Sequence, residues 1–236
     1  IRFSYTGEED VLRNFTLEVK KGECVAITGA SGCGKTTLSK LLLGLYPLGE
    51  GDICVNGMSM RESDLADLRR QIAYVPQEPY LFQGSIAENI RMGRPDATEK
   101  EIREAAMQAH AHDFIIELPD GYDTEISERG ARLSNGQRQL LAFARTMVSD
   151  PRILILDEAT SSIDTQTEIQ VQQGIESLLK GRTSFIIAHR LSTIKNADRI
   201  FVIDHGKIFE QGTHDELMAK QGAYYQLYQA QFRRVS

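Results

Sequence analysis

The stretch CVAITGASGCGKTTLSKLLLGL, from Cys24 to Leu45, decides the fold. An apolar run of strand length, CVAIT, leads directly into a glycine-rich loop, and the residues after the loop place leucines at helical spacing. The loop matches G-x-x-x-x-G-K-[ST] at residues 29–36, and its position between a strand and a helix is the context in which this pattern indicates a phosphate-binding loop. The alternative, a chance glycine-rich turn, is weakened by the two flanking elements.

This loop predicts a site for the phosphates of a nucleotide, which the family resemblance given below implies is ATP. Its glycines let backbone N–H groups converge on phosphate oxygens, and the N-terminus of the following helix favours an anion. Lys35 is placed to reach the β- and γ-phosphates, and the Thr36 hydroxyl to bind Mg²⁺. The residues that we expect to contact ATP here are Gly29, Ala30, Ser31, Gly32, Cys33, Gly34, Lys35, Thr36 and Thr37.

A second apolar strand, ILILD, ends in Asp157 and is followed by Glu158. A carboxylate at the carboxyl end of a strand lies at the edge where α/β sheets bind ligands, so we expect Asp157 to hold Mg²⁺. Glu158, which the metal does not need, is the natural general base for a water molecule. The alternative is that both acids simply begin a solvated helix.

The remaining segments indicate an α/β fold. Continuous apolar strands at 152–157, 183–189 and 199–204, the first two separated by a helix, are typical of a parallel sheet covered on both faces. Short strands are expected at 2–5, 15–19, 51–58 and 71–77, with an Asn-Gly turn at residues 56–57, and weaker helices at 214–219 and 224–232. The expected architecture is a P-loop NTPase core of parallel strands with an N-terminal antiparallel β region and an inserted helical subdomain.

We expect one domain over residues 1–236, in which 1–77 and 151–236 form the ATP-binding core and 78–150 the helical subdomain. The chain has a formal net charge of −6, which argues against nucleic acid as a partner. Its three cysteines show no C-x-x-C spacing, and no apolar run is long enough for a membrane span. The chain starts at Ile1 in a strand-like pattern, without an initiator Met, so we expect it to be part of a longer protein.

Six motifs occur in the order found in the nucleotide-binding domain of ATP-binding cassette (ABC) proteins, and the chain resembles that family over nearly its whole length. The motifs are GASGCGKT, VPQEP with Gln77, LSNGQ, LILDE, SSID and IAHR with His189. Three further stretches resemble the exporter branch, of the multidrug or lipid type: LFQGSIAENI, ERGARLSNGQ and residues 189–218.

The resemblance implies that the LSNGQ signature contacts the ATP held by a second copy, so that two ATP molecules are sandwiched between two domains. Ser134 would offer a hydroxyl, and the helix start would offer free N–H groups. The residues expected to contact ATP in this way are Ser134, Asn135, Gly136 and Gln137. Asn135 replaces the first glycine of the usual LSGGQ, and Asn tolerates a left-handed backbone better than most residues. A harmless variant and a weakened contact both stay open.

The resemblance also assigns roles to single residues. Gln77 resembles the glutamine that senses Mg²⁺ and the attacking water beside the membrane domain, and His189 the histidine that contacts the γ-phosphate. Asp164 resembles the acid that communicates between protomers, and Tyr5 the aromatic that stacks on adenine. Each has a structural alternative: a polar turn residue for Gln77, a structural histidine for His189, a helix N-cap for Asp164 and a packed edge tyrosine for Tyr5.

Cys33 raises a separate hypothesis, because a thiol among converging N–H groups and beside Lys35 would be reactive. The alternative is that Cys33 fills a position that takes a small residue.

The expected function is that of the ATP-hydrolysing motor of a membrane exporter, which works with Mg²⁺ at the cytoplasmic face of the cell membrane. Its expected partners are a second nucleotide-binding domain and, through the Gln77 region, an upstream transmembrane domain. The rival is a soluble ABC clamp acting on nucleic acid or a ribosome. A non-hydrolysing regulatory cassette is a third possibility, although Lys35, Asp157, Glu158 and His189 are all intact.

Overall fold

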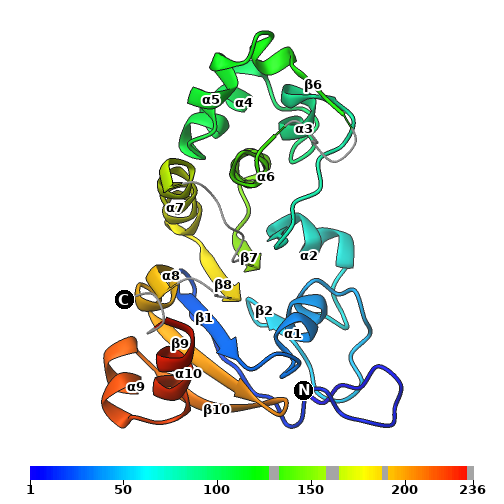
Figure 1. The fold of residues 1–236 in the computed structure, drawn as a ribbon. Helices are drawn as coiled ribbons and strands as arrows, with labels where there is room; N and C mark the ends of the chain where they lie inside the picture. Colours follow the sequence, from blue (N-terminus) through cyan, green and yellow to red (C-terminus); the bar gives the residue numbers. More distant parts are fainter. Residues whose placement is uncertain (128–132, 158–164, 188–190, 233–236) are drawn as a thin grey trace. The chain divides into compact units, whose positions relative to one another are not determined.

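The structure is a computed structural model that describes residues 1–127, 133–157, 165–187 and 191–232. The described residues fall into two units (Figure 1). The first unit takes its residues from 1–72, 155–158 and 183–236, and the second from 73–154 and 159–182. The predicted division into a core of 1–77 and 151–236 and a helical subdomain of 78–150 stays a prediction.

The sheet of the first unit is built around β1 (Cys24–Gly29). β1 pairs in parallel with β8 (Thr183–Ile187) and with β9 (Arg199–Asp204). β10 (Lys207–Gly212) pairs antiparallel with β9, and β7 (Ile153–Asp157) follows β8, which makes the strand order β10-β9-β1-β8-β7. The middle residues of β1, β8 and β9 are buried, as strands covered on both faces require. The predicted α/β class, with mainly parallel strands, is confirmed.

β10 was not expected from the sequence. The sequence of this strand, KIFEQG, does not show the regular alternation of apolar and polar residues that indicates a strand. Its large apolar residue Phe209 is 65% exposed, and the register with β9 shifts between Ile208 and Glu210. The two-residue turn that joins it to β9 has positive φ at His205 and Gly206. A Cβ at Gly206 would lie 2.2 Å from the carbonyl oxygen of Val11, so the turn also requires glycine for space. Beyond β10, the chain closes with α9 (His214–Lys220) and α10 (Ala223–Phe232) (Figure 1).

The N-terminal region of the first unit is antiparallel but sparsely paired. Isolated bridges join Arg2 to Glu50 and Phe3 to Leu12. The predicted Asn-Gly turn is confirmed: it joins β2 (Cys54–Val55) to β3 (Met58–Ser59), with φ of 52° and 79° at its two residues. α2 (Leu65–Gln71) was not expected, because seven residues with Leu65 and Leu68 as the large apolar ones are too few to show a helical period.

The strand predicted at 15–19 is wrong. Burial does alternate there, with Phe15 buried and Thr16 exposed, but the segment joins no ladder. Phe15 instead exchanges two hydrogen bonds with the first residue: its N–H donates to the Ile1 carbonyl at 2.9 Å, and the Ile1 ammonium donates to the Phe15 carbonyl at 2.7 Å. An alternation of apolar and polar residues indicates an extended chain with one buried face, but it does not show that a neighbouring strand pairs with it.

The second unit is mainly helical and centres on α6 (Asn135–Ser149), which packs against α3, α4 and α7 (Figure 1). A close approach to α7 is set by Gly174, where a Cβ would lie 2.9 Å from Cδ2 of Phe143 and 3.1 Å from the carbonyl oxygen of Ala109. The other elements of this unit are β4 (Ile72–Val75), β5 (Gly84–Ser85), α3 (Ile86–Arg91), α4 (Glu99–Gln108), α5 (His112–Glu117), the 3-10 turn η1 (Gly121–Asp123), β6 (Glu125–Ile126) and α7 (Thr165–Leu179).

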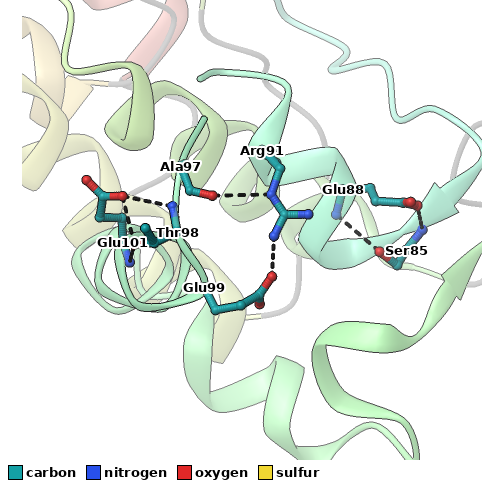
Figure 2. Close-up of polar contacts among 7 residues, drawn as sticks. All are labelled: Ser85, Glu88, Arg91, Ala97, Thr98, Glu99 and Glu101. Atoms are coloured by element: carbon teal, nitrogen blue, oxygen red, sulfur yellow. Dashed lines mark hydrogen bonds and ion pairs between the residues drawn. The ribbon is translucent and has the colours of Figure 1, made fainter. Parts of the chain in front are cut away.

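Two helices of this unit begin in the same way. In α3, Ser85 accepts from the N–H of Glu88 while the Glu88 carboxylate accepts from the N–H of Ser85; Thr98 and Glu101 repeat the arrangement at α4 (Figure 2). Such reciprocal caps satisfy two backbone donors that a helix start otherwise leaves exposed. They define where α3 and α4 begin, and Ser134 and Gln137 form a third cap of this kind at α6.

Candidate nucleotide-binding site

The loop between β1 and α1 (Lys35–Leu42) has a backbone that requires glycine. Gly29, Gly32 and Gly34 have φ of 150°, 79° and 110°. A Cβ at Gly29 would lie 2.2 Å from the Ile203 carbonyl oxygen, and one at Gly34 would lie 2.8 Å from Cδ2 of Leu12. The loop therefore fits tightly against β9 and the N-terminal segment at Gly29 and Gly34. A Cβ at Gly32 would meet nothing within 4 Å, so the main chain there is open to a ligand.

The side chain of Lys35 folds back toward the start of this loop. Its Nζ donates to the carbonyl oxygens of Gly29 and Ala30, at 2.9 Å each, and lies 3.7 Å from Sγ of Cys33. Residue Gly34 caps α1 without a side-chain hydrogen bond, and the first turn of α1 contains no acidic residue. The cation and the helix N-terminus therefore both favour an anion at the same place.

The two threonines that begin α1 differ in exposure. Thr36 is exposed, whereas Thr37 is buried and its hydroxyl lies 3.1 Å from the Tyr5 hydroxyl. The Tyr5 ring remains 45% exposed and packs edge-on against the ring of Tyr46, with 5.1 Å between the ring centroids. The sequence-predicted adenine contact thus lies beside the phosphate loop.

Tyr46 and Lys40 were not predicted to be site residues, because neither belongs to a motif. Nζ of Lys40 lies 5.9 Å from the Tyr5 ring centroid and 6.0 Å from that of Tyr46, which is cation–π distance. The only sequence signal that could have found Lys40 is its place one helical turn after Thr36, on the same face of α1.

Asp157 ends β7, which is separated from β1 by β8 alone in the strand order. Neighbouring strands are about 4.8 Å apart, so β7 and β1 are spaced by about 10 Å. This spacing brings Asp157 and the phosphate loop to one sheet. The predicted residues Glu158, Asp164 and His189 lie outside the described residues.

Gln77 and the signature residues belong to the second unit. Gln77 is exposed, two residues after the end of β4. Ser134 caps α6: its hydroxyl accepts from the N–H of Gln137 at 3.2 Å, and the Gln137 side chain accepts from the N–H of Ser134 at 3.0 Å. The expectation of several free N–H groups needs correction, since the cap uses that of Gln137. Among the described residues, the N–H groups of Asn135 and Gly136 have no acceptor, and the Ser134 hydroxyl keeps its proton to donate.

The tolerance of Asn for a left-handed backbone turns out not to matter at position 135. Asn135 is the first residue of α6, and it is absent from the residues with positive φ. Its side-chain oxygen accepts a hydrogen bond from the guanidinium of Arg138, one turn further along the helix. A right-handed helical φ and ψ at the first position of a helix is unstrained for Asn as it is for Gly, so the substitution of Asn for Gly needs no special tolerance.

Cys33 belongs to the phosphate loop, and its side chain packs against Gly29. Its side chain is buried, at 6% exposure, and a Cβ on Gly29 would lie 2.8 Å from its Sγ. Burial restricts access of reagents to the thiol, which favours the packing alternative. The reactive-thiol hypothesis stays a prediction.

The donor set fits a nucleoside triphosphate with Mg²⁺. Mg²⁺ in such sites is held by one or two protein oxygens together with phosphate oxygens, and the exposed Thr36 hydroxyl and the Asp157 carboxylate supply oxygens of this kind. The glycine cradle and Lys35 supply what a polyphosphate needs: main-chain donors, a cation and room that a Cβ would fill.

Comparison with known proteins identifies relatives of this chain. The sequence profile described as ABC transporter matches residues 12–161. The ATP-dependent lipid A-core flippase of Syntrophus aciditrophicus (strain SB) is 50% identical over 233 residues, which cover 99% of this chain and 39% of the flippase. ABC transporter B family member 2 of Dictyostelium discoideum is 52% identical over 229 residues, which cover 96% of this chain and 16% of that protein.

A solved structure of a bacterial Atm1-family ABC exporter with ATP bound superposes with a TM-score of 0.91 at 41% identity, covering 98% of this chain and 41% of the exporter chain. The described residues thus have the P-loop NTPase fold of an ABC ATPase. This chain spans about two fifths or less of the length of these relatives. Among its described residues, no helix combines the length and the apolar character that crossing a bilayer requires.

Proposed function

This chain belongs to the ABC transporter family, and we propose that it is the ATP-binding and ATP-hydrolysing motor domain of a membrane exporter. The observation that carries the proposal is the phosphate loop, where Lys35 lies over a backbone that only glycine can adopt. The relatives support the exporter assignment, because one is named a flippase and another an exporter with ATP bound.

In the proposed mechanism, the loop of residues 29–34 and Lys35 bind the phosphates, and the exposed ring of Tyr5 stacks on adenine. Thr36 and Asp157 hold Mg²⁺, which when bound neutralises charge on the phosphate oxygens. These contacts orient the triphosphate and cost little reorganisation, since the loop is already shaped.

Glu158 is the general base that takes a proton from the attacking water, a role that contributes about 10²–10⁴ in rate. Gln77 orients that water and His189 contacts the γ-phosphate. These roles follow from family membership and from the position of each residue after a strand of the sheet.

The second proposed contact is made between copies. The Ser134 hydroxyl and the N–H groups of Asn135 and Gly136 begin a fifteen-residue helix, and we propose that they bind the γ-phosphate of ATP held by a second nucleotide-binding domain, with Gln137 and Asp164 at the same interface. ATP then bridges the two domains, and hydrolysis removes the bridge and reopens them.

The proposed membrane partner is a transmembrane domain that contacts the region of Gln77, with this chain at the cytoplasmic face of the membrane. This chain covers about two fifths of the flippase, which leaves room in such relatives for a membrane part. The rival function, a soluble clamp on nucleic acid or a ribosome, is disfavoured by the net charge of −6 and by the names of the relatives.

The test is to substitute Glu158→Gln, which replaces the carboxylate with a carboxamide of nearly the same shape and so removes the base, and to measure molar mass by light scattering with and without MgATP. We expect a monomer without nucleotide and a dimer with MgATP. The same variant carrying Lys35→Met is the control and should stay monomeric. A Glu158→Gln protein that binds ATP and stays monomeric would sink the proposal of closure between two copies of this chain.

A further inference from the structure

Arg145 is a charged residue on the central helix of the second unit that the proposed mechanism leaves without a role. It belongs to α6, three turns after Ser134, and the residues on both sides of it along the helix, Ala144 and Thr146, are buried. Desolvation lowers the pKa of its guanidinium, because burial disfavours the charged form. A cation in such surroundings is costly unless polar atoms surround it.

Within the described part of the chain, the guanidinium donates hydrogen bonds to one short segment, residues 80–89. Its Nε donates to the Asn89 carbonyl at 2.8 Å, its Nη1 to the Tyr80 carbonyl at 3.0 Å and its Nη2 to the Asn89 side-chain oxygen at 3.1 Å. Among the described residues, none of its partners is a carboxylate. Since the charge is balanced by carbonyl dipoles alone, ion pairing is not what the arginine contributes here.

Asn89 extends this connection along the segment. It is 2% exposed, and its side-chain oxygen accepts from the N–H of Phe82 at 2.9 Å while its amide nitrogen donates to the carbonyls of Phe82 at 2.9 Å and Ser85 at 3.0 Å. Arg145 of α6 therefore holds the Tyr80 end of the turn directly, and it holds the Ser85 end through Asn89 of α3. Each tie is directional, because the guanidinium fork accepts only one arrangement of carbonyl groups.

The turn presents an aromatic pair to solvent. Tyr80 and Phe82 are 50% and 44% exposed, and their rings meet edge-on with centroids 4.9 Å apart. The Arg145 guanidinium lies 5.6 Å from the centroid of the Phe82 ring. The exposed rings are thus fixed to α6 through both their main chain and one of their faces.

We propose that Arg145 is a positioning residue that couples the N-terminus of α6 to the aromatic pair of Tyr80 and Phe82, so that the two move as one rigid piece. This inference rests on the proposed function, in which ATP of a second copy binds at Ser134. The helix between Ser134 and Arg145 is about 16 Å long and stiff, so a displacement of its start is carried to the guanidinium. The hydrogen bonds from the guanidinium to the carbonyls of Tyr80 and Asn89 then transmit the displacement to the exposed rings.

The experiment measures amide hydrogen exchange of the whole chain by mass spectrometry, in the Glu158→Gln background, with Arg145→Lys and Arg145→Met. Lysine keeps a cation and loses the fork, and methionine keeps the stem alone. Arg182→Lys is the matched control, because Arg182 also donates to main-chain carbonyls in this unit, those of Pro151 at 3.1 Å and Leu178 at 2.9 Å, without contacting residues 80–89. Circular dichroism verifies that each variant folds.

Without nucleotide, we expect both Arg145 variants to exchange about tenfold to a hundredfold faster over residues 80–89, because the lost hydrogen bonds involve a charged donor. With MgATP, the peptide containing residues 134–137 should be protected in every variant. MgATP should protect the peptide of residues 80–89 in the parent and in Arg182→Lys. It should not protect this peptide in either Arg145 variant.

Three results would overturn the inference. Unchanged exchange over residues 80–89 in the nucleotide-free Arg145 variants would mean that Arg145 positions nothing there. An MgATP response over 80–89 that persists in both Arg145 variants would mean a merely structural role. A parent in which MgATP protects the phosphate loop but not residues 134–137 would show that the proposed closure fails, and the coupling would fail with it.

Discussion

Asn135 is the residue at which the signature of this chain departs from the usual LSGGQ. It occupies the first helical position of α6, where its side chain accepts a hydrogen bond from Arg138. At that position neither Asn nor Gly is strained, and both leave the same backbone N–H group exposed. The substitution in the family's usual motif is therefore expected to affect the ATP contact little.

We expect Asn135→Gly to leave ATP turnover within about threefold and to lower the free energy of unfolding by at most about 1 kcal/mol, the cost of a glycine in a helix. Steady-state phosphate release and thermal unfolding measure the two quantities. Ser134→Ala serves as the comparison, since it removes both the cap and the hydroxyl and should reduce both. A collapse of turnover in Asn135→Gly would reveal a specific role for the carboxamide.

At this scale, motifs predicted where Lys35, Thr36 and Ser134 lie, because a backbone shape and a helix start leave a local pattern. Arg145 had no such pattern. It stands among apolar residues of one helix, and its partners lie more than fifty residues earlier in the chain. A sequence cannot distinguish a solvated arginine from one that is held by distant carbonyls.

Helices in both units begin with the same reciprocal cap. The pairs Ser85–Glu88, Thr98–Glu101, Ser134–Gln137 and Thr213–Glu216 all form reciprocal caps. The pattern [ST]-x-x-[EQ] is local, so these starts could have been predicted from the sequence. The signature serine thus has a structural duty that the same residue type performs at other helices of this chain.

The cap of α4 predicts a pH dependence. Hydrogen bonds from the Thr98 backbone, the Thr98 side chain and then Arg94 hold the pKa of Glu101 at about 2, below its ordinary value of 4.5. Figure 2 shows the two bonds from Thr98. A depressed pKa contributes stability that is fully present above pH 4.5 and is lost as the pH falls toward 2. Because Gln also completes such a cap, Glu101→Gln should keep the helix start and lose this dependence.

We expect the thermal midpoint of the parent to fall more steeply than that of Glu101→Gln between pH 5 and pH 3, as measured by circular dichroism. Glu104→Gln, on the same helix and paired with Lys100, removes one carboxylate without touching the cap and should follow the parent. Parallel curves for the parent and Glu101→Gln would contradict the assignment of this carboxylate to the cap.

For the whole molecule, nucleotide binding should appear as added stability. A ligand at about one hundred times its dissociation constant adds about 2.7 kcal/mol, and for a chain of this size each kcal/mol raises the midpoint by about 2–4 °C. We therefore expect saturating MgATP to raise the thermal midpoint by about 5–10 °C. Lys35→Met should abolish the rise, whereas Lys180→Met, an exposed lysine at the end of α7, should preserve it. An equal rise in both would mean that ATP binds elsewhere.

The sequence by itself determined the phosphate loop, the parallel strands around it and the helices at 99–108 and 135–149, because glycine geometry, apolar runs and helical spacing are local properties of the chain. The tertiary structure alone decided that residues 15–19 join no sheet and bond to Ile1 instead, that β10 closes the sheet edge and that Arg145 holds Tyr80 and Asn89. Each of these depends on which distant segment supplies a hydrogen-bond partner. That choice is made by packing of the whole chain, and no local pattern records it.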